Sequence, residues 1–385
     1  MKVASRALCA AIACALGIES TAAFADDASS APSTDADLQL ETITVTAEKR
    51  EQSVNDIGVA VTAFSARDVE QLGFSSYKDI ADQTPGLSTV NATSGGTPIF
   101  AIRGIGLDDF NSNNTSGVGV YIDNVLAAYP VFLNGQLFDI ERIEVLKGPQ
   151  GTLYGRNTTG GAINYISIKP TDTFDAYQTV GFGSWNTWRF NGALNGPIGN
   201  GADGRIAYSW EKGDGWQHDI DTGRAFGSTD RFAMRAQVSQ FFGDITEVLL
   251  NVHATRDTGA PLSPQNETVD AVYQVPPGTY GYLSDDPRRV RVGNFDLSRD
   301  ESGAGASSTV TVSFPSMTFM SIAGFDHYSR KTSDNYDGTA QTTDNIGVDD
   351  TYSLWSQEFR LSSAGTQRLN WIMGAVGSYD KINGL

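Results

Sequence analysis

Five glycines lie close together in the first half of the chain, at Gly148, Gly151, Gly155, Gly160 and Gly161. A loop that cradles phosphate has glycines followed by Gly-Lys-Ser or Gly-Lys-Thr at the start of a helix. In this chain the last two glycines instead precede an apolar run that favours a strand, which disfavours a phosphate loop. We expect these glycines to form tight turns, because glycine adopts backbone conformations that other residues avoid.

Other side chains with catalytic or metal-binding chemistry show no informative spacing. The three histidines, His218, His253 and His327, are far apart in the sequence and lack the spacing of a metal site. A Gly-x-Ser-x-Gly nucleophile motif is absent, and no pair of carboxylates stands out from the many others. We therefore expect no enzyme, no cofactor and no metal site.

The net charge argues against one class of partner, and the N-terminal residues indicate export. The formal net charge is −18 and the sequence pI is about 4.5, which argues against a nucleic-acid partner. Residues 1–25 have the basic start, the apolar core and the small-residue end of a signal peptide. Both cysteines, Cys9 and Cys14, lie in that segment, and acylation of Cys14, as in a lipoprotein, is the alternative.

The glycines belong to residues 50–170, where the sequence predicts a small mixed α/β domain. The expected helices are 65–72 and 76–83, each with a serine at its N-cap. Residues 26–49 precede this domain and begin with a Ser/Ala/Asp-rich stretch, so we expect them to be flexible. The expected strands are 59–64, 87–91, 99–103, 118–122, 140–146 and 162–168.

Residues 171–385 show the strict alternation of amphipathic strands. For example, Ile206 and Trp210 alternate with Ala207 and Ser209. After the first hairpin, short and long connections also alternate, which is typical of an outer-membrane barrel, although a soluble sandwich of amphipathic strands is an alternative. The short connections are 196–203, 242–244, 315–316 and 363–367, and the long ones are 212–229, 256–306 and 329–350.

The segment 138–170 makes the interpretation more specific, because its motifs follow one another in a fixed order. They are Arg142-Ile143-Glu144-Val145, Lys147-Gly148-Pro149, Leu153-Tyr154-Gly155 and Gly160-Gly161-Ala162-Ile163-Asn164. Through these residues the chain resembles the TonB-dependent outer-membrane receptor family. The resemblance implies an α+β plug domain, residues 50–170, followed by an antiparallel transmembrane β-barrel, residues 171–385.

The number of strands predicts an incomplete barrel. We count roughly nine strands in residues 171–385, whereas a barrel that encloses a plug has about 22. At ~10 residues per strand, 22 strands and their loops need more residues than this segment contains. We therefore expect the chain to be the front portion of a longer receptor.

The segment Glu41-Thr42-Ile43-Thr44-Val45-Thr46-Ala47 alternates like an extended strand and has no partner strand nearby in the sequence. Such a segment is suited to pairing with the sheet edge of another protein, and the alternative is an edge strand of the first domain. It resembles the TonB box of the family. The resemblance implies that TonB binds here.

The resemblance also implies charged contacts between plug and barrel. In the family, arginines that match Arg103 and Arg142 face acidic residues of the barrel, and Glu358 resembles such a partner. We predict a lock of Arg103, Arg142, Glu144, Arg156 and Glu358, with solvation of each charge as the alternative.

The function implied is active, TonB-coupled uptake of a scarce solute across the outer membrane of a Gram-negative bacterium. The implied partners are TonB, outer-membrane lipid and an extracellular small-molecule ligand. A ferric siderophore or similar iron chelate is the expected solute, and a carbohydrate or other organic nutrient is the alternative. A soluble, secreted β-rich binding protein is a further alternative.

Overall fold

The structure is a computed structural model that describes residues 44–91, 98–107, 114–133, 137–264, 286–293, 295–335, 345–364 and 369–384. The predicted signal peptide, residues 26–43 and therefore Glu41, Thr42 and Ile43 of the predicted TonB box lie outside these residues. Thr42–Leu385 form one compact unit. Within the described ranges, no helix has the length and apolar character that crossing a membrane would require.

The first part of the described chain, which we call the α/β domain, contains strands β1 to β9. Its central sheet has five strands in the order β3-β8-β9-β6-β7, and two pairs of strands, β1-β2 and β4-β5, flank it. Its strands are β1 (Thr44–Val45), β2 (Gln52–Ser53), β3 (Ala60–Ser65), β4 (Leu87–Asn91), β5 (Pro98–Ile102), β6 (Val118–Ile122), β7 (Val125–Ala127), β8 (Ile140–Lys147) and β9 (Gly161–Ser167). Its helical turns are α1 (Ala66–Gln71), α2 (Ile80–Gln83), α3 (Gly151–Tyr154) and the 3-10 turn Pro130–Leu133.

The two predicted helices differ in how well the sequence places them. Helix α1 begins where expected, because Ser65 and Asp68 form a reciprocal capping box at its N-terminus. The second helix, α2, is shorter than predicted and does not begin at Ser76. The Asp79 carboxylate accepts hydrogen bonds from the backbone N–H groups of Ser75 and Ser76, so these residues form a turn before the helix.

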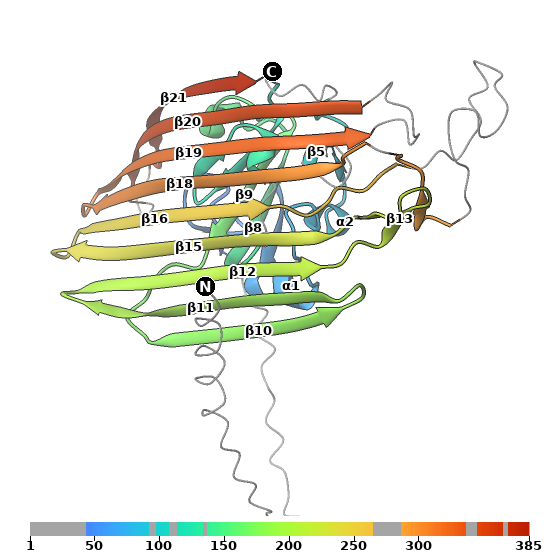
Figure 1. Cartoon of the computed structure of the whole chain (residues 1–385). Coiled ribbons are helices and arrows are strands. Elements are labelled where there is room, and N and C mark those ends of the chain that lie inside the picture. The colour runs from blue at the N-terminus through green and yellow to red at the C-terminus, as the bar shows by residue number, and fades with distance from the viewer. Residues whose placement is uncertain are drawn as a thin grey trace, which may run out of the picture. The chain divides into compact units, whose positions relative to one another are not determined.

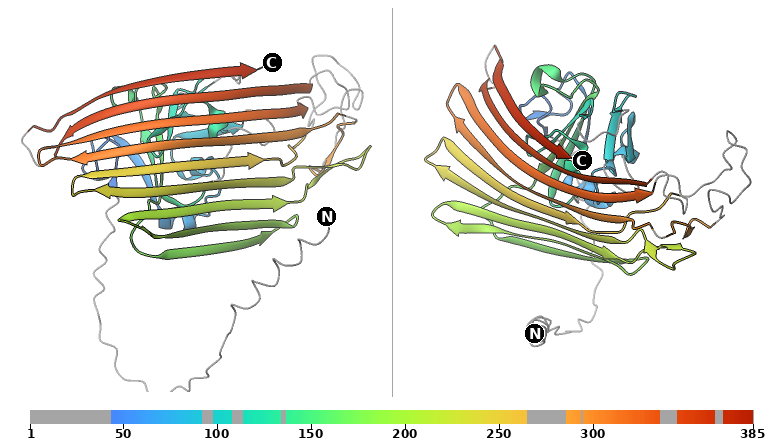
Figure 2. Two further views of the ribbon diagram at one scale, coloured as in Figure 1. Left: turned by 60° about the vertical axis from the view of Figure 1, so that its left-hand side comes forward. Right: turned by 45° about the horizontal axis from the view of Figure 1, so that its top comes forward.

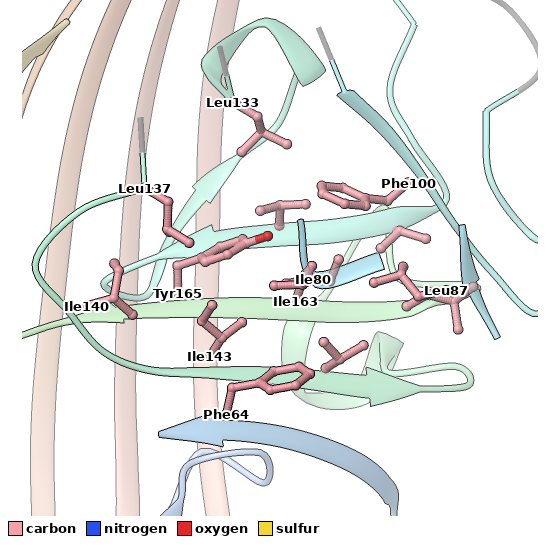
Figure 3. Packing of buried hydrophobic residues seen from close by; sticks show 14 residues of the cluster. Phe64, Ile80, Leu87, Phe100, Leu133, Leu137, Ile140, Ile143, Ile163 and Tyr165 are labelled. Carbon is pink, nitrogen blue, oxygen red and sulfur yellow. The ribbon is translucent and has the colours of Figure 1, made fainter. Parts of the chain in front are cut away.

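The larger of two apolar clusters in the α/β domain lies against its central sheet (Figure 3). Phe64, Ile143, Ile163 and Tyr165 come from three neighbouring strands of the central sheet, and all are buried. The hydroxyl of Tyr165 donates a 2.8 Å hydrogen bond to the carbonyl oxygen of Tyr77, and the two rings meet edge to face at 4.7 Å. The polar end of this tyrosine is therefore satisfied inside the core.

The second part is one antiparallel sheet of nine strands, which we call the long sheet (Figure 1). Each strand pairs with the next long strand in the sequence, and the sheet curves, as Figure 2 shows. The predicted fold class and the number of strands are confirmed. The strands are β10 (Asp175–Gly183), β11 (Thr187–Gly199), β12 (Ala202–Gly213), β15 (Thr229–Phe242), β16 (Thr246–Asp257), β18 (Ser298–Ser313), β19 (Met317–Asn335), β20 (Asn345–Ser363) and β21 (Ile372–Gly384).

The strands reach further into the predicted long connections than expected. β19 continues to Asn335 and β20 begins at Asn345, although residues 329–350 were predicted to form a loop. The extension of β19 is polar, that of β20 adds Ile346 and Val348 between polar residues, and cross-strand contacts stabilise both. Arg330 and Asp350 face each other in the register, and Arg330 Nε lies 3.0 Å from Asp350 Oδ1.

Two of the long connections also pair with each other, which the sequence did not predict. β13 (Gln217–Asp219) lies between β14 (Ala225–Phe226) and β17 (Arg289–Val290) in a three-stranded sheet. Phe226 and Val290 are buried in a small apolar cluster of their own. The described parts of these two connections are therefore packed together at one end of the long sheet (Figure 1).

The faces of the long sheet are arranged opposite to those of a soluble sandwich. Along β12, Arg205, Ala207 and Ser209 are buried, whereas Ile206 and Trp210 are exposed. The same inversion recurs on the neighbouring strands, where large apolar side chains are exposed. A soluble sandwich would bury its apolar face, so this arrangement favours a sheet whose outer face lies in lipid.

Candidate functional site

The described part of the predicted TonB box is docked on the α/β domain. Thr44–Val45 pair with Gln52–Ser53, and the backbone N–H of Lys49 donates to the carbonyl oxygen of Thr46 in the turn between them. Val45 and Ala47 are fully buried, in a cluster with Tyr121, Leu146 and Tyr154. The expectation of a strand without a nearby partner is wrong, because the turn at Lys49, with its φ of 60°, brings residues 52–53 back alongside it.

The Glu144 carboxylate is the polar centre of this docking site. It is fully buried and accepts hydrogen bonds from Thr46 N (2.7 Å), Arg142 Nε (2.9 Å) and Asn164 Nδ2 (3.1 Å). Asn164 Nδ2 also lies 2.8 Å from Tyr154 Oη. A buried carboxylate is stable only when its oxygens accept hydrogen bonds in this way. The docked segment supplies one of these hydrogen bonds through the backbone N–H of Thr46.

Lys49 and Arg50 join this segment to the long sheet. Lys49 is 8% exposed, and its Nζ lies 4.2 Å from the ring centre of Tyr154 and 5.0 Å from that of Tyr121. The same Nζ lies 3.9 Å from Glu358 Oε2 on β20. Burial lowers the pKa of Lys49 to about 8, while the nearby Glu358 carboxylate opposes this shift.

Arg50 reaches the sheet at a different place. Its Nη2 donates to the carbonyl oxygen of Trp371 and, at 3.3 Å, to Ser363 Oγ at the end of β20. The segment 44–50 therefore contacts both parts of the molecule. Its residues 45–49 contact the α/β domain, and Lys49 and Arg50 contact the long sheet.

The residues predicted to form the lock do not all meet. Arg142 and Glu144 pair with each other inside the α/β domain, and Glu358 pairs with Arg360 (Nε–Oε1 2.9 Å) and with Lys49. The expectation that Arg103 or Arg142 meets Glu358 is therefore wrong, because nearer partners occupy Arg142 and Glu358. Arg103 is exposed, in a turn where its backbone N–H donates to the carbonyl oxygen of Gly86.

One predicted lock residue does contact the long sheet. Arg156 Nη2 lies 3.2 Å from Asp380 Oδ1 on β21. The hydroxyl of Tyr129 donates to the other oxygen of Asp380. These two contacts join the α/β domain to the last described strand of the sheet.

The most buried ion pairs between the domain and the sheet were missed by the sequence analysis. Asp139, just before β8, accepts Arg205 Nε at 2.9 Å, and its Oδ2 lies 3.7 Å from Arg235 Nη2. Arg235 also donates to the carbonyl oxygen of Asp139 at 2.9 Å. All three side chains are at least nine-tenths buried. The sequence did contain a signal for these ion pairs. Arg205 on β12 and Arg235 on β15 alternate with outward-facing apolar residues, so both arginines had to face inward, toward the α/β domain.

The five predicted turn glycines lie around the α3 turn and the start of β9. Gly161 shows the clearest requirement, because a Cβ there would lie 2.2 Å from the carbonyl oxygen of Leu146. Gly155 has a φ of 76° at the end of α3, and Gly148 has a φ of 107°. Gly151 begins α3, and a Cβ at Gly160 would lie 2.9 Å from the carbonyl oxygen of Ile105. Close approach of β9 to β8 therefore depends on Gly161.

Among the residues that the structure describes, no group of three or more His, Cys, Asp or Glu side chains is placed to hold a metal ion.

The sequence matches the family model of the TonB-dependent receptor plug domain over residues 53–162. It is similar to a pesticin receptor of Yersinia pestis, with 31% identity over 162 residues, which are 42% of this chain and 24% of the receptor. It is also similar to a vitamin B12 transporter of Vibrio vulnificus, with 30% identity over 210 residues, which are 53% of this chain and 33% of the transporter. The chain thus spans a third or less of these curated relatives.

The fold is similar to that of solved receptors. The ferric yersiniabactin uptake receptor of Yersinia pestis superimposes with a TM-score of 0.71 at 20% sequence identity, over 85% of this chain and 49% of that one. The ferripyoverdine receptor of Pseudomonas aeruginosa superimposes with a TM-score of 0.69 at 15% identity, over 89% of this chain and 45% of that one.

Proposed function

We propose that this chain, which belongs to the TonB-dependent receptor family, acts in active uptake of an iron chelate across the outer membrane. The α/β domain is the plug, and the long sheet is the described part of the barrel wall. The exposed apolar side chains of the sheet face lipid, and the buried arginines face the plug.

The observation that carries the proposal is the docked segment Thr44–Ala47. It is a short strand held by hydrogen bonds of Thr46 to Glu144, Arg142 and Tyr154, by one two-residue pairing and by a small apolar contact. Such a strand can leave its site without unfolding the central sheet. Once free, it can add to the sheet edge of TonB through backbone hydrogen bonds, which is how extended peptides are recognised.

The contacts around the segment suggest how occupancy and release are coupled. The Tyr121 and Tyr154 rings that cover Lys49 belong to β6 and α3, and Tyr121 donates a 2.5 Å hydrogen bond to the carbonyl oxygen of Tyr154. A solute that shifts this part of the plug would disturb Lys49 and the Thr46–Glu144 hydrogen bond together. The segment would then be free for TonB.

The choice of an iron chelate is supported by the relatives. The structural relatives with the described fold include receptors for ferric yersiniabactin and ferripyoverdine. The vitamin B12 transporter favours the second candidate, an organic nutrient taken up by the same mechanism.

The test is uptake by a strain that lacks the gene and carries it on a plasmid. Probes are 55Fe bound to a hydroxamate, a catecholate or a hydroxycarboxylate chelator, and 57Co-labelled vitamin B12. Deletion of Thr42–Thr46 should abolish uptake and leave binding at the cell surface intact, whereas deletion of the five residues Ser30–Thr34 should change neither. Uptake that survives the first deletion contradicts the mechanism, and uptake of vitamin B12 alone would favour the second candidate. Recovery of the protein in the aqueous fraction after lysis would support a soluble binding protein.

A further inference from the structure

A cavity of about 100 Å³ lies between the plug and the wall, and residues 44–50 are not part of its lining. On the plug side it is lined by the turn between β6 and β7 and by Phe132, and on the wall side by β15, β16, β18 and β19. On β18 the lining residues are Gly303, Ala304 and Ser307, and Gly303 lets its neighbours pack closely, since a Cβ there would lie 2.7 Å from the Tyr328 ring and 3.0 Å from Thr255 Cγ2. This volume would hold about three water molecules, or one small organic group.

Two buried polar atoms that belong to the cavity lining have no hydrogen-bond partner among the described residues. They are the amide oxygen of Asn251 on β16, a side chain that is 6% exposed, and the Nε of Arg235 on β15, a side chain that is 7% exposed. Leaving such atoms unpaired in a protein interior costs about 1–3 kcal/mol each. The site is therefore built to receive one hydrogen-bond donor and one acceptor from another molecule.

The charged groups of the lining already have partners. Arg235 lies 3.7 Å from Asp139, and His253 Nε2 lies 2.8 Å from Asp326 Oδ1. Asp123 accepts hydrogen bonds from Ser167 and from Asn251 Nδ2. Besides the hydroxyl groups of Tyr77, Thr255 and Ser307, the lining contributes the two unpaired buried atoms, a neutral acceptor on Asn251 and an N–H donor on Arg235, and it also includes the rings of Phe132 and Phe138.

We propose that this cavity is an interior binding site for a hydroxyl-bearing organic group. A hydroxyl can donate to Asn251 Oδ1 and accept from Arg235 Nε, and its carbon atoms can pack on the two rings. The inference rests on the proposed function for the source of the group, which would be a polar part of the transported solute as it passes between plug and wall.

The site can be tested without transport by labelling an introduced cysteine. The two cysteines of the chain, Cys9 and Cys14, both lie in the predicted signal peptide, so they do not compete for the reagent once that segment is removed. The probes are 2-hydroxyethyl and propyl methanethiosulfonate, which differ by a hydroxyl in place of a methyl group. Ser307→Cys places a thiol in the cavity lining. Ser209→Cys is the matched control, since Ser209 is 4% exposed on the inward face of β12 and does not line the cavity. Thr255→Cys is a second reporter in the lining, in case the first variant does not fold.

In outer-membrane fractions, Ser307→Cys should react roughly ten-fold faster than Ser209→Cys, because a packed site reacts only through local opening. The hydroxyethyl reagent should react about five-fold faster than the propyl reagent at Ser307→Cys, the ratio that one ordinary hydrogen bond supports. Adding Asn251→Leu should abolish this preference. Equal rates at the two cysteines, or an equal preference with and without Asn251, would overturn the proposal.

Cells then separate this proposal from the proposed function. If the wild-type protein takes up a probe chelate, modification of Ser307→Cys by the propyl reagent should slow that uptake, and modification of Ser209→Cys should not. Unchanged uptake after complete modification of Ser307→Cys would overturn a role in passage. Failure of the wild-type protein to take up any probe would refute the proposed function, and the labelling rates would still decide the binding site.

Discussion

The ion pairs of Asp139 should hold the plug on the wall more strongly than any other contact described between the two. Asp139→Asn would leave the guanidinium groups of Arg205 and Arg235 buried without a carboxylate, since both side chains are at least nine-tenths buried. Removing one partner of a buried ion pair costs about 3–5 kcal/mol. We expect the free energy that seats the plug to fall by this amount.

The assay is urea titration of the detergent-solubilised protein with a fluorophore on Ser88→Cys, an exposed position of the α/β domain. All six tryptophans lie at residues 185–371, outside that domain, so their fluorescence reports the wall separately. The Asp139→Asn protein should lose the plug signal at lower urea than the wild type, while the tryptophan signal changes less.

Glu141→Gln is the matched control, because Glu141 lies two residues further on and its side chain is 44% exposed. Its ion pair with Arg142 is worth ~0–1 kcal/mol at such exposure. A triple variant, Asp139→Leu with Arg205→Met and Arg235→Met, should recover most of the loss, because no charge is then left unpaired. If Asp139→Asn and Glu141→Gln shift the plug transition equally, the reasoning about buried charge is refuted.

Three further predictions concern the docked segment and the central sheet. Glu144→Gln should weaken docking of the segment by ~1–3 kcal/mol, because hydrogen bonds to a charged carboxylate are lost. A spin label on Thr44→Cys should then become mobile, and an unchanged spectrum would contradict this. Burial lowers the pKa of Lys49 from 10.5 to about 8 in the docked state. Between pH 8 and 10.5, Lys49 is therefore protonated when the segment is undocked and neutral when it is docked. Docking then releases a proton, so it should strengthen as the pH rises from 8 to 10.5. Lys49→Met should abolish this pH dependence of the same spin label, and a dependence that persists would assign it to another group. Gly161→Ala should destabilise the plug by more than ~2 kcal/mol because its Cβ would overlap the carbonyl oxygen of Leu146, whereas Gly58→Ala, with open space around it, should stay within ~1 kcal/mol in the same urea titration.

Much of the fold was predictable because its signals are local. The nine strands of the wall are visible as alternation with a period of two, and the start of helix α1 is visible as the N-cap serine Ser65. The extension of β19 was missed because it lacks alternating apolar residues, and that of β20 was missed because its alternation is limited to Ile346 and Val348. Their pairing depends on backbone hydrogen bonds and on cross-strand contacts such as Arg330 with Asp350.

The candidate site was less predictable because its contacts join distant parts of the sequence. The docking of Thr46 depends on Glu144, which lies 98 positions further along the chain. The partners of Asp139 depend on which face of β12 and β15 turns toward the plug and on how the plug is seated against them. The sequence analysis expected arginines on the plug and carboxylates on the wall. At Asp139 the charges are the other way round, because the carboxylate belongs to the plug and the two arginines belong to the wall.

The order of the plug strands has a mechanical consequence. β1 pairs with β2 in a hairpin of two residue pairs, so tension applied from the N-terminus would separate these pairs one after the other, which needs less force than shearing them at once. The next strand along the chain, β3, lies at an edge of the sheet order β3-β8-β9-β6-β7. Continued tension could therefore strip β3 first and leave β8, β9 and β6 paired, so a passage beside the plug could open through stepwise loss of an edge, without extraction of the whole domain.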